Sequence, residues 1–527
     1  MDNLDTLHSR LEYFYDIGVS LSSEHDLDRL LEKILVAAKT ITCADAGTLY
    51  LMSPNQRALQ FKIIRTDSLG IAINIGHGDS APPHFPDVQL YLPDGSPNLS
   101  MIAAYAAVKG VSVNLPDAYT AEGFDFTGTR KFDERSSYRS QSFLTIPMRN
   151  HEDEIIGVLQ LINAKSSTGQ TIPFPQADQK LSESLASQAA VAITNRQLIN
   201  QMEKLFEATI QMINSAIDEK SPYTGGHCQR VPELTMLLAE AADEVESGPL
   251  ADFKLTDRDR YELRIAALLH DCGKITTPVH VVDKSTKLET IYDRLSLVDT
   301  RFEAVKRTLE ARMWKSVAQW RPLAEARASY LAEVEALEDD RAFIRKTNTG
   351  GEKMSDEDVD RVKAIAKRYP WEGPDGSPAP FLTDNEVENL TIRAGTLTTE
   401  ERNIINKHIS STITMLEHLP WPKHLTRVPE YAGGHHERMD GKGYPKGLTR
   451  EQMSVQARMM AIADIFEALT ASDRPYKRPM KLSLALKIME NFKDTAHIDP
   501  DLYDVFIQSK VYAKYAEAHL SPEQMDV

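Results

Sequence analysis

The 527-residue chain has few cysteines and no long apolar run. Its three cysteines, Cys43, Cys228 and Cys272, are an odd number and lie far apart, so we expect no disulfide framework. No stretch approaches the roughly 18 uncharged apolar residues typical of a membrane-spanning helix, and the first residues lack the basic and apolar regions of a secretory signal. The sequence therefore predicts a cytoplasmic protein with no membrane partner.

An excess of positive charge is also absent. The chain contains 60 Lys and Arg against 77 Asp and Glu, a formal net charge of −17. This balance argues against bulk binding to a nucleic acid polymer or to an anionic membrane, so an anionic substrate would need a local cationic site. The apolar share of 42% is that of a globular protein, and the length predicts about three domains.

The first 195 residues have the pattern of a mixed α/β domain. Helical spacing of apolar residues covers 26–40, strand-like runs follow at 46–52, 59–64, 142–148 and 155–162, and a loop rich in Gly and Pro covers 76–100. We expect an antiparallel sheet with flanking helices.

Residues 177–220 contain neither glycine nor proline, which predicts one long helix. Its apolar or small positions alternate at steps of four and three: Leu181, Leu185, Ala192, Ile199, Met202, Phe206, Ile213 and Ala216. The helix either packs on its own domain or pairs with a second copy of the chain in a coiled coil. Its length, beyond the usual globular range, favours a linker helix in a homodimer.

The remaining sequence is predominantly helical. The segment 290–394 differs from its flanks because it is highly charged and contains none of the 15 histidines. It also carries three of the four tryptophans, Trp314, Trp320 and Trp371. We interpret it as a helical subdomain inserted into an all-α domain made of 221–289 and 395–527, and it could cover the site, regulate it or restrict the substrate.

A His-Asp pair ends one apolar helical run. His270 and Asp271 offer a neutral nitrogen and a carboxylate, which together suit a divalent ion such as Fe, Mn or Zn. Asp271 can also bridge two ions through its two oxygens. Lys274 follows within one turn, so its ammonium group can face the same site.

Further candidate ligands are scattered along the helical region. His435 and His436 precede a turn rich in glycine, and His408 and His227 lie in helical segments. Asp464 stands among Ala, Ile and Phe, where a carboxylate is costly unless it is paired or bound to metal. Singly each signal is weak, but their combination indicates a metal site.

These motifs resemble a known family. LLHDCGK resembles the signature of HD-superfamily metal-dependent phosphohydrolases, and HHERMDGKGYPKGL resembles that of the HD-GYP subfamily. SPYTGGHCQRV and IADIFEALTASDRPYK are similar to the family's opening segment and later helix. The resemblance implies a cyclic di-GMP phosphodiesterase with a metal centre in an all-helical domain.

The resemblance also assigns roles to residues. Lys274 would lie beside the scissile phosphate, Arg474 and Lys477 would bind phosphate, and Tyr444 and Pro445 would shape the substrate pocket. The implied metal ligands are His227, His270, Asp271, His408, His435, His436 and Asp464. Among them, Asp271 would bridge the ions and act with Lys274 as a catalytic residue.

Two divalent ions are implied, with Fe or Mn favoured and Zn, Ni or Mg as alternatives. Some members of the family bind a third ion through a glutamate at the position of Tyr223, so the resemblance implies a binuclear site here. The product would be pGpG, or GMP after two cuts. The same site could hydrolyse cyclic GMP-AMP or another nucleotide phosphoester. An alternative of another class is a silent adaptor that binds the dinucleotide without turnover, although such a binder need not keep the metal ligands and Lys274.

The first domain resembles a GAF sensor domain through VNLPDAYTAEGFDF, YRSQSFLTIPMRN and EIIGVLQLINA. Asn163, Phe174 and Asp178 match part of the pattern of GAF domains that bind cyclic nucleotides, whereas Ala164 and Gln179 replace its Lys and Glu. A cyclic nucleotide, another small-molecule ligand and a purely structural role in dimerisation therefore stay open. If the GAF domain binds a ligand, the helix 177–220 would transmit this signal to the helical domain.

Overall fold

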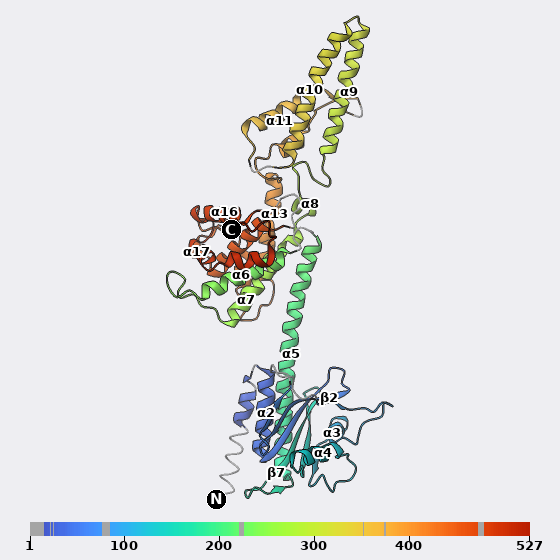
Figure 1. Cartoon of the computed structure of the whole chain (residues 1–527), viewed down its shortest axis with the longest axis vertical. Helices are drawn as coiled ribbons and strands as arrows, with labels where there is room; N and C mark the ends of the chain where they lie inside the picture. Colours follow the sequence, from blue (N-terminus) through green and yellow to red (C-terminus); the bar gives the residue numbers. More distant parts are fainter. Residues whose placement is uncertain are drawn as a thin grey trace. The chain divides into compact units, whose positions relative to one another are not determined.

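The computed structural model describes residues 15–21, 23–24, 26–75, 85–220, 226–350, 353–373, 376–472 and 479–527. The chain divides into two compact units, Met1–Phe206 and Glu207–Val527 (Figure 1). Among the described residues, no helix is long and apolar enough to cross a bilayer.

The first unit is built on an antiparallel sheet with the order β3-β2-β1-β7-β6-β5, in which β4 also pairs with β2 and β8 with β7. The strands are β1 Ala44–Met52, β2 Ala58–Thr66, β3 Ile71–Asn74, β4 Val88–Gln89, β5 Val113–Leu115, β6 Phe143–Arg149, β7 Ile155–Lys165 and β8 Thr171–Ile172. Four of them match the predicted strands. The predicted loop 76–100 contains the short strand β4, and its first part lies outside the described residues.

Alternating side chains of the central strands enter two apolar cores. Leu49 and Leu159 face helices α2 (Leu27–Thr42) and α5 (Gln176–Lys220), whereas Tyr50 and Val158 face α3 (Ile102–Lys109). A period of two follows from the pleat of a strand. The sheet therefore carries helices on both faces, as predicted, with α4 (Thr127–Ser136) completing the unit.

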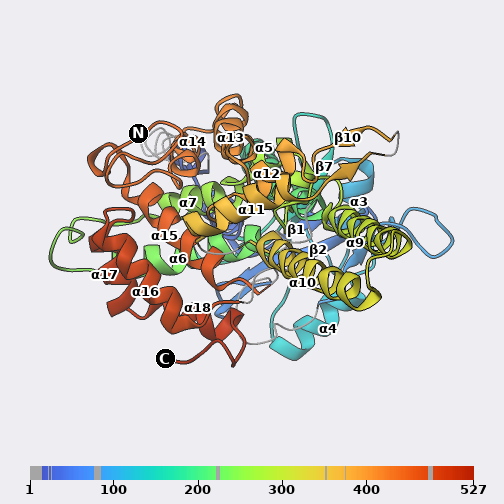
Figure 2. The ribbon, with the colours of Figure 1, turned by 90° about the horizontal axis from the view of Figure 1, so that it is seen from above.

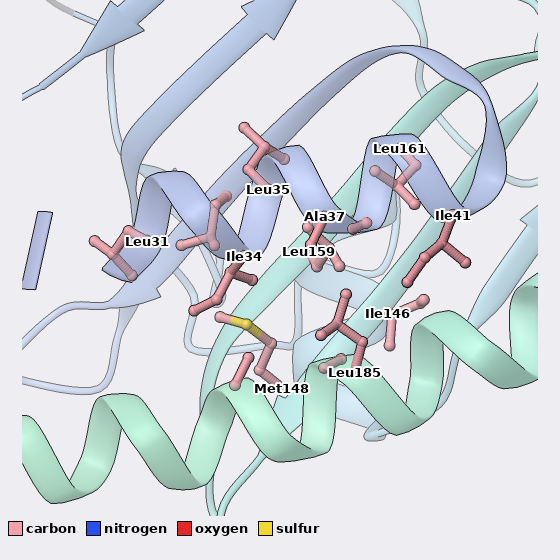
Figure 3. Close-up of a cluster of buried hydrophobic side chains, with 14 of the residues drawn as sticks. Leu31, Ile34, Leu35, Ala37, Ile41, Ile146, Met148, Leu159, Leu161 and Leu185 are labelled. Atoms are coloured by element: carbon pink, nitrogen blue, oxygen red, sulfur yellow. The ribbon is translucent and has the colours of Figure 1, made fainter. Parts of the chain in front are cut away.

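The larger core lies between α2, the sheet and α5 (Figure 3). Leu31, Ile34 and Leu35 share one face of α2 because they are spaced three and four residues apart. They meet Met148 of β6 and Leu185 of α5, and all five side chains are at least 99% buried. This core fixes the first part of α5 to the sheet.

Helix α5 spans Gln176–Lys220 and confirms the long helix predicted for 177–220. Its first part packs on its own domain, where Leu185 and Ile193 are fully buried. Farther along, Ile199 and Met202 are 46% and 71% exposed. Packing on its own domain therefore applies to part of the helix, and the homodimer stays a prediction.

The second unit is helical. Its elements outside the predicted insertion are α6 His227–Asp243, α7 Asp257–Leu269, η1 Cys272–Thr276, α8 Val279–Val282, α13 Thr399–Glu417, α14 Val428–Gly433, η2 Arg450–Gln452, α15 Val455–Thr470, α16 Leu482–Asp494, α17 Pro500–Gln508 and α18 Val511–His519. Helix α6 packs against α7 and α15, and η1 packs against α13. Figure 2 shows α15, α16 and α17 as neighbours.

The predicted insertion is helical and has a core of its own. Its elements are α9 Leu295–Ala318, α10 Leu323–Asn348, α11 Asp356–Arg368, β9 Trp371–Glu372, β10 Pro378–Ala379 and α12 Asp384–Leu390. Phe302, Ile344, Val362 and Phe381 are buried together in this core. The limits 290 and 394, like the other predicted domain limits, stay predictions.

Candidate metal centre

Helix ends, the interiors of two helices and short segments bring the predicted ligands together. His227 begins α6, His270 caps the C-terminus of α7, and Asp271 is the residue before η1. His408 lies within α13, His435 and His436 follow α14, and Asp464 lies within α15. Each of these ligands except His436 is at most 8% exposed.

The first group of ligands surrounds Asp271. Its Oδ2 atom lies 3.1 Å from Nε2 of His227 and 3.3 Å from Nε2 of His270. Asp464 joins this group, since its Oδ1 atom lies 3.2 Å from Nε2 of His227. The ligand atoms of His227, His270 and Asp271 lie within 4.8 Å of one another, close enough to hold one ion.

The second group lies on the other side of the same carboxylate. The Oδ1 atom of Asp271 is 3.2 Å from Nε2 of His408, which in turn is 3.3 Å from Nε2 of His436. The ligand atoms of His408, His435 and His436 also lie within 4.8 Å of one another. Asp271 therefore presents one oxygen to each group.

Backbone carbonyls orient three of the imidazoles. The Nδ1 atoms of His270, His408 and His435 each donate to the carbonyl three residues earlier, at 2.7, 2.5 and 2.7 Å. A hydrogen bond at Nδ1 leaves the Nε2 lone pair for a metal. All three side chains thus turn Nε2 toward the site.

Two residues that the sequence analysis did not select support His227. Nδ1 of His227 lies 2.5 Å from Oε2 of Glu467, which is fully buried on α15. Nε of Arg230 donates to the other oxygen of Glu467 at 2.7 Å. The signal available in the sequence was the spacing of Asp464 and Glu467, three residues apart, which places both on one helix face.

Opposing effects set the charges in the site. Burial disfavours charge, yet the carboxylates of Asp271, Asp464 and Glu467 raise the pKa of His227 well above its usual value. For Asp271, Lys274 and His270 outweigh burial and hold the pKa well below its usual range. The carboxylate is therefore ionised at neutral pH.

The paired histidines behave in the opposite way. Burial lowers the pKa of His435 well below its usual value, and His436 and His270 lower it further. Burial also lowers the pKa of His436 to about 4. Both imidazoles are neutral at physiological pH, which is the form that binds a metal.

The ammonium group of Lys274 contacts Asp271 directly. Burial alone would lower its pKa, but the charges of Asp271 and Asp464 raise it. Gly273 lies between Asp271 and Lys274 in the sequence and allows η1 to approach α13 closely. A Cβ atom at this position would lie 2.0 Å from the carbonyl oxygen of His408. The backbone N–H of Gly273 donates to Oγ1 of Thr412 at 2.9 Å.

A folded loop forms one side of the centre. The ring of Tyr444 stacks on His436 with centroids 4.9 Å apart, and the Tyr444–Pro445 peptide bond is cis. The buried carboxylate of Glu437 accepts hydrogen bonds from the backbone N–H groups of Lys446 and Leu448, at 2.7 and 2.8 Å. Glu437 therefore holds the turn that follows the ligands.

A pocket of about 460 Å³ opens beside these ligands. Its walls include His436, Tyr444 and Asp464, together with the basic side chains of Arg438 and Lys442. A pocket with this lining can accept an anionic ligand next to the metal-binding groups. The predicted phosphate-binding residues Arg474 and Lys477 lie outside the described residues, as does Tyr223.

The predicted ligand residues of the first domain have structural contacts. The side chain of Asn163 accepts from the backbone N–H of Gln141 at 2.7 Å and donates to the carbonyl of Arg139 at 2.8 Å. Phe174 belongs to the core between α2 and α5, and Asp178 is buried in the first turn of α5. Their role in binding a ligand stays a prediction.

The donor set fits a divalent metal. Nε2 of His435 is buried without a hydrogen-bond partner among the described residues, as is Oδ1 of Asp271. An unpaired buried lone pair is costly unless a cation or a donor meets it. Five imidazoles and two carboxylates are ligands that Fe, Mn and Zn accept, so the residues present can hold a metal centre.

Comparisons with known proteins agree with this arrangement. Residues 26–193 match the GAF domain family, and residues 224–347 and 384–502 match two descriptions of the HD domain. The gap between the two HD matches contains helix α11 and falls within the predicted insertion 290–394.

Several curated proteins are similar to parts of the chain. A 3'3'-cGAMP-specific phosphodiesterase from Vibrio cholerae is 26% identical over 297 residues, which are 56% of this chain and 37% of that protein. A dual cyclic-AMP and cyclic-GMP phosphodiesterase from Takifugu rubripes is 29% identical over 41% of this chain and 22% of its own length. A cyclic di-GMP phosphodiesterase from Pseudomonas aeruginosa is 36% identical over 22% of this chain and 27% of its own length.

The matched regions span little more than a third, or less, of these relatives. The domain matches and the folds of the two units nevertheless agree with each other. The chain therefore combines an N-terminal GAF domain with a helical region of the HD type.

Proposed function

We propose that this chain is a metal-dependent phosphodiesterase that hydrolyses cyclic di-GMP to pGpG or GMP. The observation that carries the proposal is the arrangement of two ligand groups on opposite oxygens of Asp271. The names of relatives that act on cyclic dinucleotides support the substrate class.

Two divalent ions are proposed, with Fe or Mn favoured over Zn, Ni or Mg. His227, His270 and Asp464 would hold one ion, His408, His435 and His436 the other, and Asp271 would bridge them. When bound, such ions lower the pKa of water and polarise phosphoryl oxygens.

The protein's own groups would position the phosphodiester. The ammonium group of Lys274 keeps its proton because Asp271 and Asp464 raise its pKa. It can therefore stabilise the negative charge that develops on a phosphoryl oxygen. Arg474 and Lys477 would add positive charge at the same phosphate, which the acidic chain as a whole does not provide.

The pocket beside the metal centre would bind the rest of the dinucleotide. The ring of Tyr444 is already stacked on His436, so it forms a flat wall next to the ligands. Pro445 would shape the turn, and Lys442 and Arg438 line the pocket with positive charge. These contacts favour an anionic nucleotide over a neutral substrate.

A second candidate substrate is 3'3'-cGAMP. It is favoured by the name of the Vibrio cholerae relative that matches more than half of this chain. Regulation by a small molecule at the GAF domain, homodimerisation through α5 and a cytoplasmic location complete the proposal.

The test is hydrolysis by the full chain, loaded with Mn or Fe under anaerobic conditions. Cyclic di-GMP, 3'3'-cGAMP and cyclic GMP are compared as substrates. Two variants of the same helix provide a matched pair, since His408 lies in the site whereas His418 caps the exposed end of α13.

We expect the wild type and His418→Ala to convert cyclic di-GMP into pGpG or GMP. We expect His408→Ala to lose at least about 100-fold in turnover, since even residues that only orient metal ligands are worth 10–100-fold. A metal-loaded wild type that cleaves none of the three substrates would contradict the proposal. Preference for 3'3'-cGAMP would select the second candidate.

A further inference from the structure

The inserted subdomain carries exposed aromatic side chains at the turn of a helical hairpin. Helices α9 and α10 pack side by side, and the turn between them follows Ala318 (Figure 2). Within this turn Trp320 is 95% exposed, and the flanking Trp314 and Leu323 are 54% and 51% exposed. We call residues 311–324 the hairpin tip.

The backbone at Trp320 adopts a conformation that usually belongs to glycine. Its φ is +69°, in the left-handed region. The N–H of Trp320 donates to the carbonyl of Val317 at 3.0 Å, and the N–H of Arg321 donates to that of Ser316 at 3.1 Å. This pair of bonds defines a Schellman turn, in which the left-handed residue is most often glycine. The turn itself thus gives no reason for an indole at this position.

The charge of the hairpin tip is opposite to that of the chain. The tip contains Arg312, Lys315 and Arg321 and no acidic residue, although the chain has a net charge of −17. Arg312 pairs with Glu333 across the hairpin. Lys315 and Arg321, by contrast, form no ion pair with any residue that the structure describes.

Four basic residues nearer the base of the hairpin have acidic partners. The pairs, with distances of 2.7 to 2.9 Å, are Lys306 with Glu338, Arg307 with Glu303, Arg341 with Asp299 and Arg345 with Asp299. Arg327 and Lys346 of α10 also form no ion pair with a described residue, so what distinguishes the tip is that its unpaired basic residues lie beside exposed tryptophans.

We propose that the hairpin tip binds the surface of an anionic phospholipid bilayer. Tryptophan prefers the headgroup region of a membrane, where its ring is apolar and its N–H can meet water or lipid. Lysine and arginine are attracted to anionic headgroups. Trp314 and Trp320 would enter that region, and Lys315 and Arg321 would face the lipid phosphates.

The geometry favours a lipid surface over a soluble ligand. A hairpin turn whose side chains are this exposed offers no concave pocket, which small-molecule sites need. Helix α9 has 24 residues and is roughly 36 Å long, whereas charges are screened beyond about 8 Å at physiological salt. Glu310 and Glu325 border the tip and partly offset its charge, whereas the acidic residues beyond the base of the hairpin are screened at this distance and repel a membrane only weakly. The proposal therefore departs from the expectation based on net charge.

The test is cosedimentation of the full chain with vesicles of phosphatidylcholine, alone or with about one-third phosphatidylglycerol. We expect binding to the anionic vesicles only, and release at high salt. Trp320→Gly should weaken this binding about tenfold or more, since it removes a large interfacial side chain. The same variant should keep or raise the melting temperature, because glycine adopts the left-handed conformation without strain.

Leu297→Ser is the matched control. Leu297 is 41% exposed in the first turn of α9, at the other end of the hairpin, so its replacement should leave vesicle binding unchanged. Absence of binding by the wild type, or equal binding by Trp320→Gly, would overturn the proposal. A lower melting temperature of Trp320→Gly would show that the indole stabilises the fold. If light scattering shows an oligomer for the wild type that Trp320→Gly does not form, the tip serves self-association. Either result would also overturn the proposal.

Discussion

Nδ1 of His227 lies 2.5 Å from the buried carboxylate of Glu467, and this contact orients one ligand of the candidate metal centre. Glu467 follows Asp464 by three residues on α15, so one helix supplies a ligand and the group that positions another ligand. Arg230, from the first turn of α6, holds the second oxygen of Glu467. The N-terminus of α6 is thus tied to α15 through the site itself.

The first prediction concerns this contact. Glu467→Gln keeps the size of the side chain but removes the charge that favours a donating Nδ1 on His227. We expect metal affinity to fall 10–100-fold, measured by competition with a chelator. Glu451→Gln, at an exposed position of η2, is the control. Equal affinities of both variants would show that Glu467 does not position His227.

The second prediction separates catalysis from metal binding. Lys274→Met removes the ammonium group beside Asp271 but none of the proposed ligands. We expect the metal content to stay unchanged and turnover to fall by about 100- to 1,000-fold, the usual effect of losing one group that stabilises charge in the transition state. Lys487→Met, exposed on α16, should behave as the wild type. Loss of metal together with turnover would contradict a role limited to the phosphate.

The third prediction concerns the close approach of η1 and α13. A Cβ atom on Gly273 would lie 2.0 Å from the backbone oxygen of His408 and 2.7 Å from Oγ1 of Thr412. Gly273→Ala should therefore lower the free energy of unfolding by about 1–3 kcal/mol, measured by chemical denaturation. Gly128→Ala is the matched control, because no atom of a described residue outside its own stretch of helix lies within 4 Å of its Cβ position. A loss no larger than that of the control would show that the contact tolerates a methyl group.

The fourth prediction is a pH dependence outside the metal centre. Burial lowers the pKa of Lys287 from 10.5 to about 8, and its Nζ atom donates to the carbonyls of Leu390 and Ile392, at 3.1 and 2.7 Å. The unfolded chain keeps the ordinary pKa, so between these two values it binds more protons than the folded chain. The free energy of unfolding should then rise with pH across this interval, by on the order of 1–3 kcal/mol.

Lys287→Met isolates this contribution because the variant has no group that titrates at the position. The unfolding free energy of both proteins is measured between the two pKa values, and the difference between their slopes is compared. Parallel pH profiles would contradict a depressed pKa at Lys287.

Local patterns made much of the fold predictable from the sequence. The apolar spacing of Leu31, Ile34 and Leu35 indicated α2, and the absence of glycine and proline indicated α5. The short strands β3, β5 and β8 were not predicted, because two to four residues carry too little periodicity and depend on pairing with longer strands. Leu185 was among the apolar positions that could pair α5 with a second copy, but it packs in the core of its own domain. The apolar spacing alone did not separate these two environments.

The sequence predicted those parts of the site in which residues that can bind a metal form recognisable motifs. Adjacent His and Asp residues and an acid on an apolar helix indicated a metal site, and the resemblance to the HD-GYP family implied the full set of seven ligands. The structure brings all seven together. Glu467 and Glu437 were missed because an acidic residue that only positions a ligand or a turn belongs to no recognisable sequence motif. The distance of Glu467 to His227 and the hydrogen bonds of Glu437 to the turn after His436 reveal these roles. For Glu467 the three-residue spacing from Asp464 was a signal in the sequence.

The most direct test of the account is the metal content of the chain, purified without oxygen, beside that of Asp271→Ala. Two groups of ligands that share Asp271 predict about two divalent ions per wild-type chain. In Asp271→Ala each of the two groups loses a ligand, so we expect this variant to bind no more than a trace of metal. A wild-type chain that binds no metal, or a variant that keeps two ions, would contradict the shared-carboxylate centre on which the proposed phosphodiesterase depends.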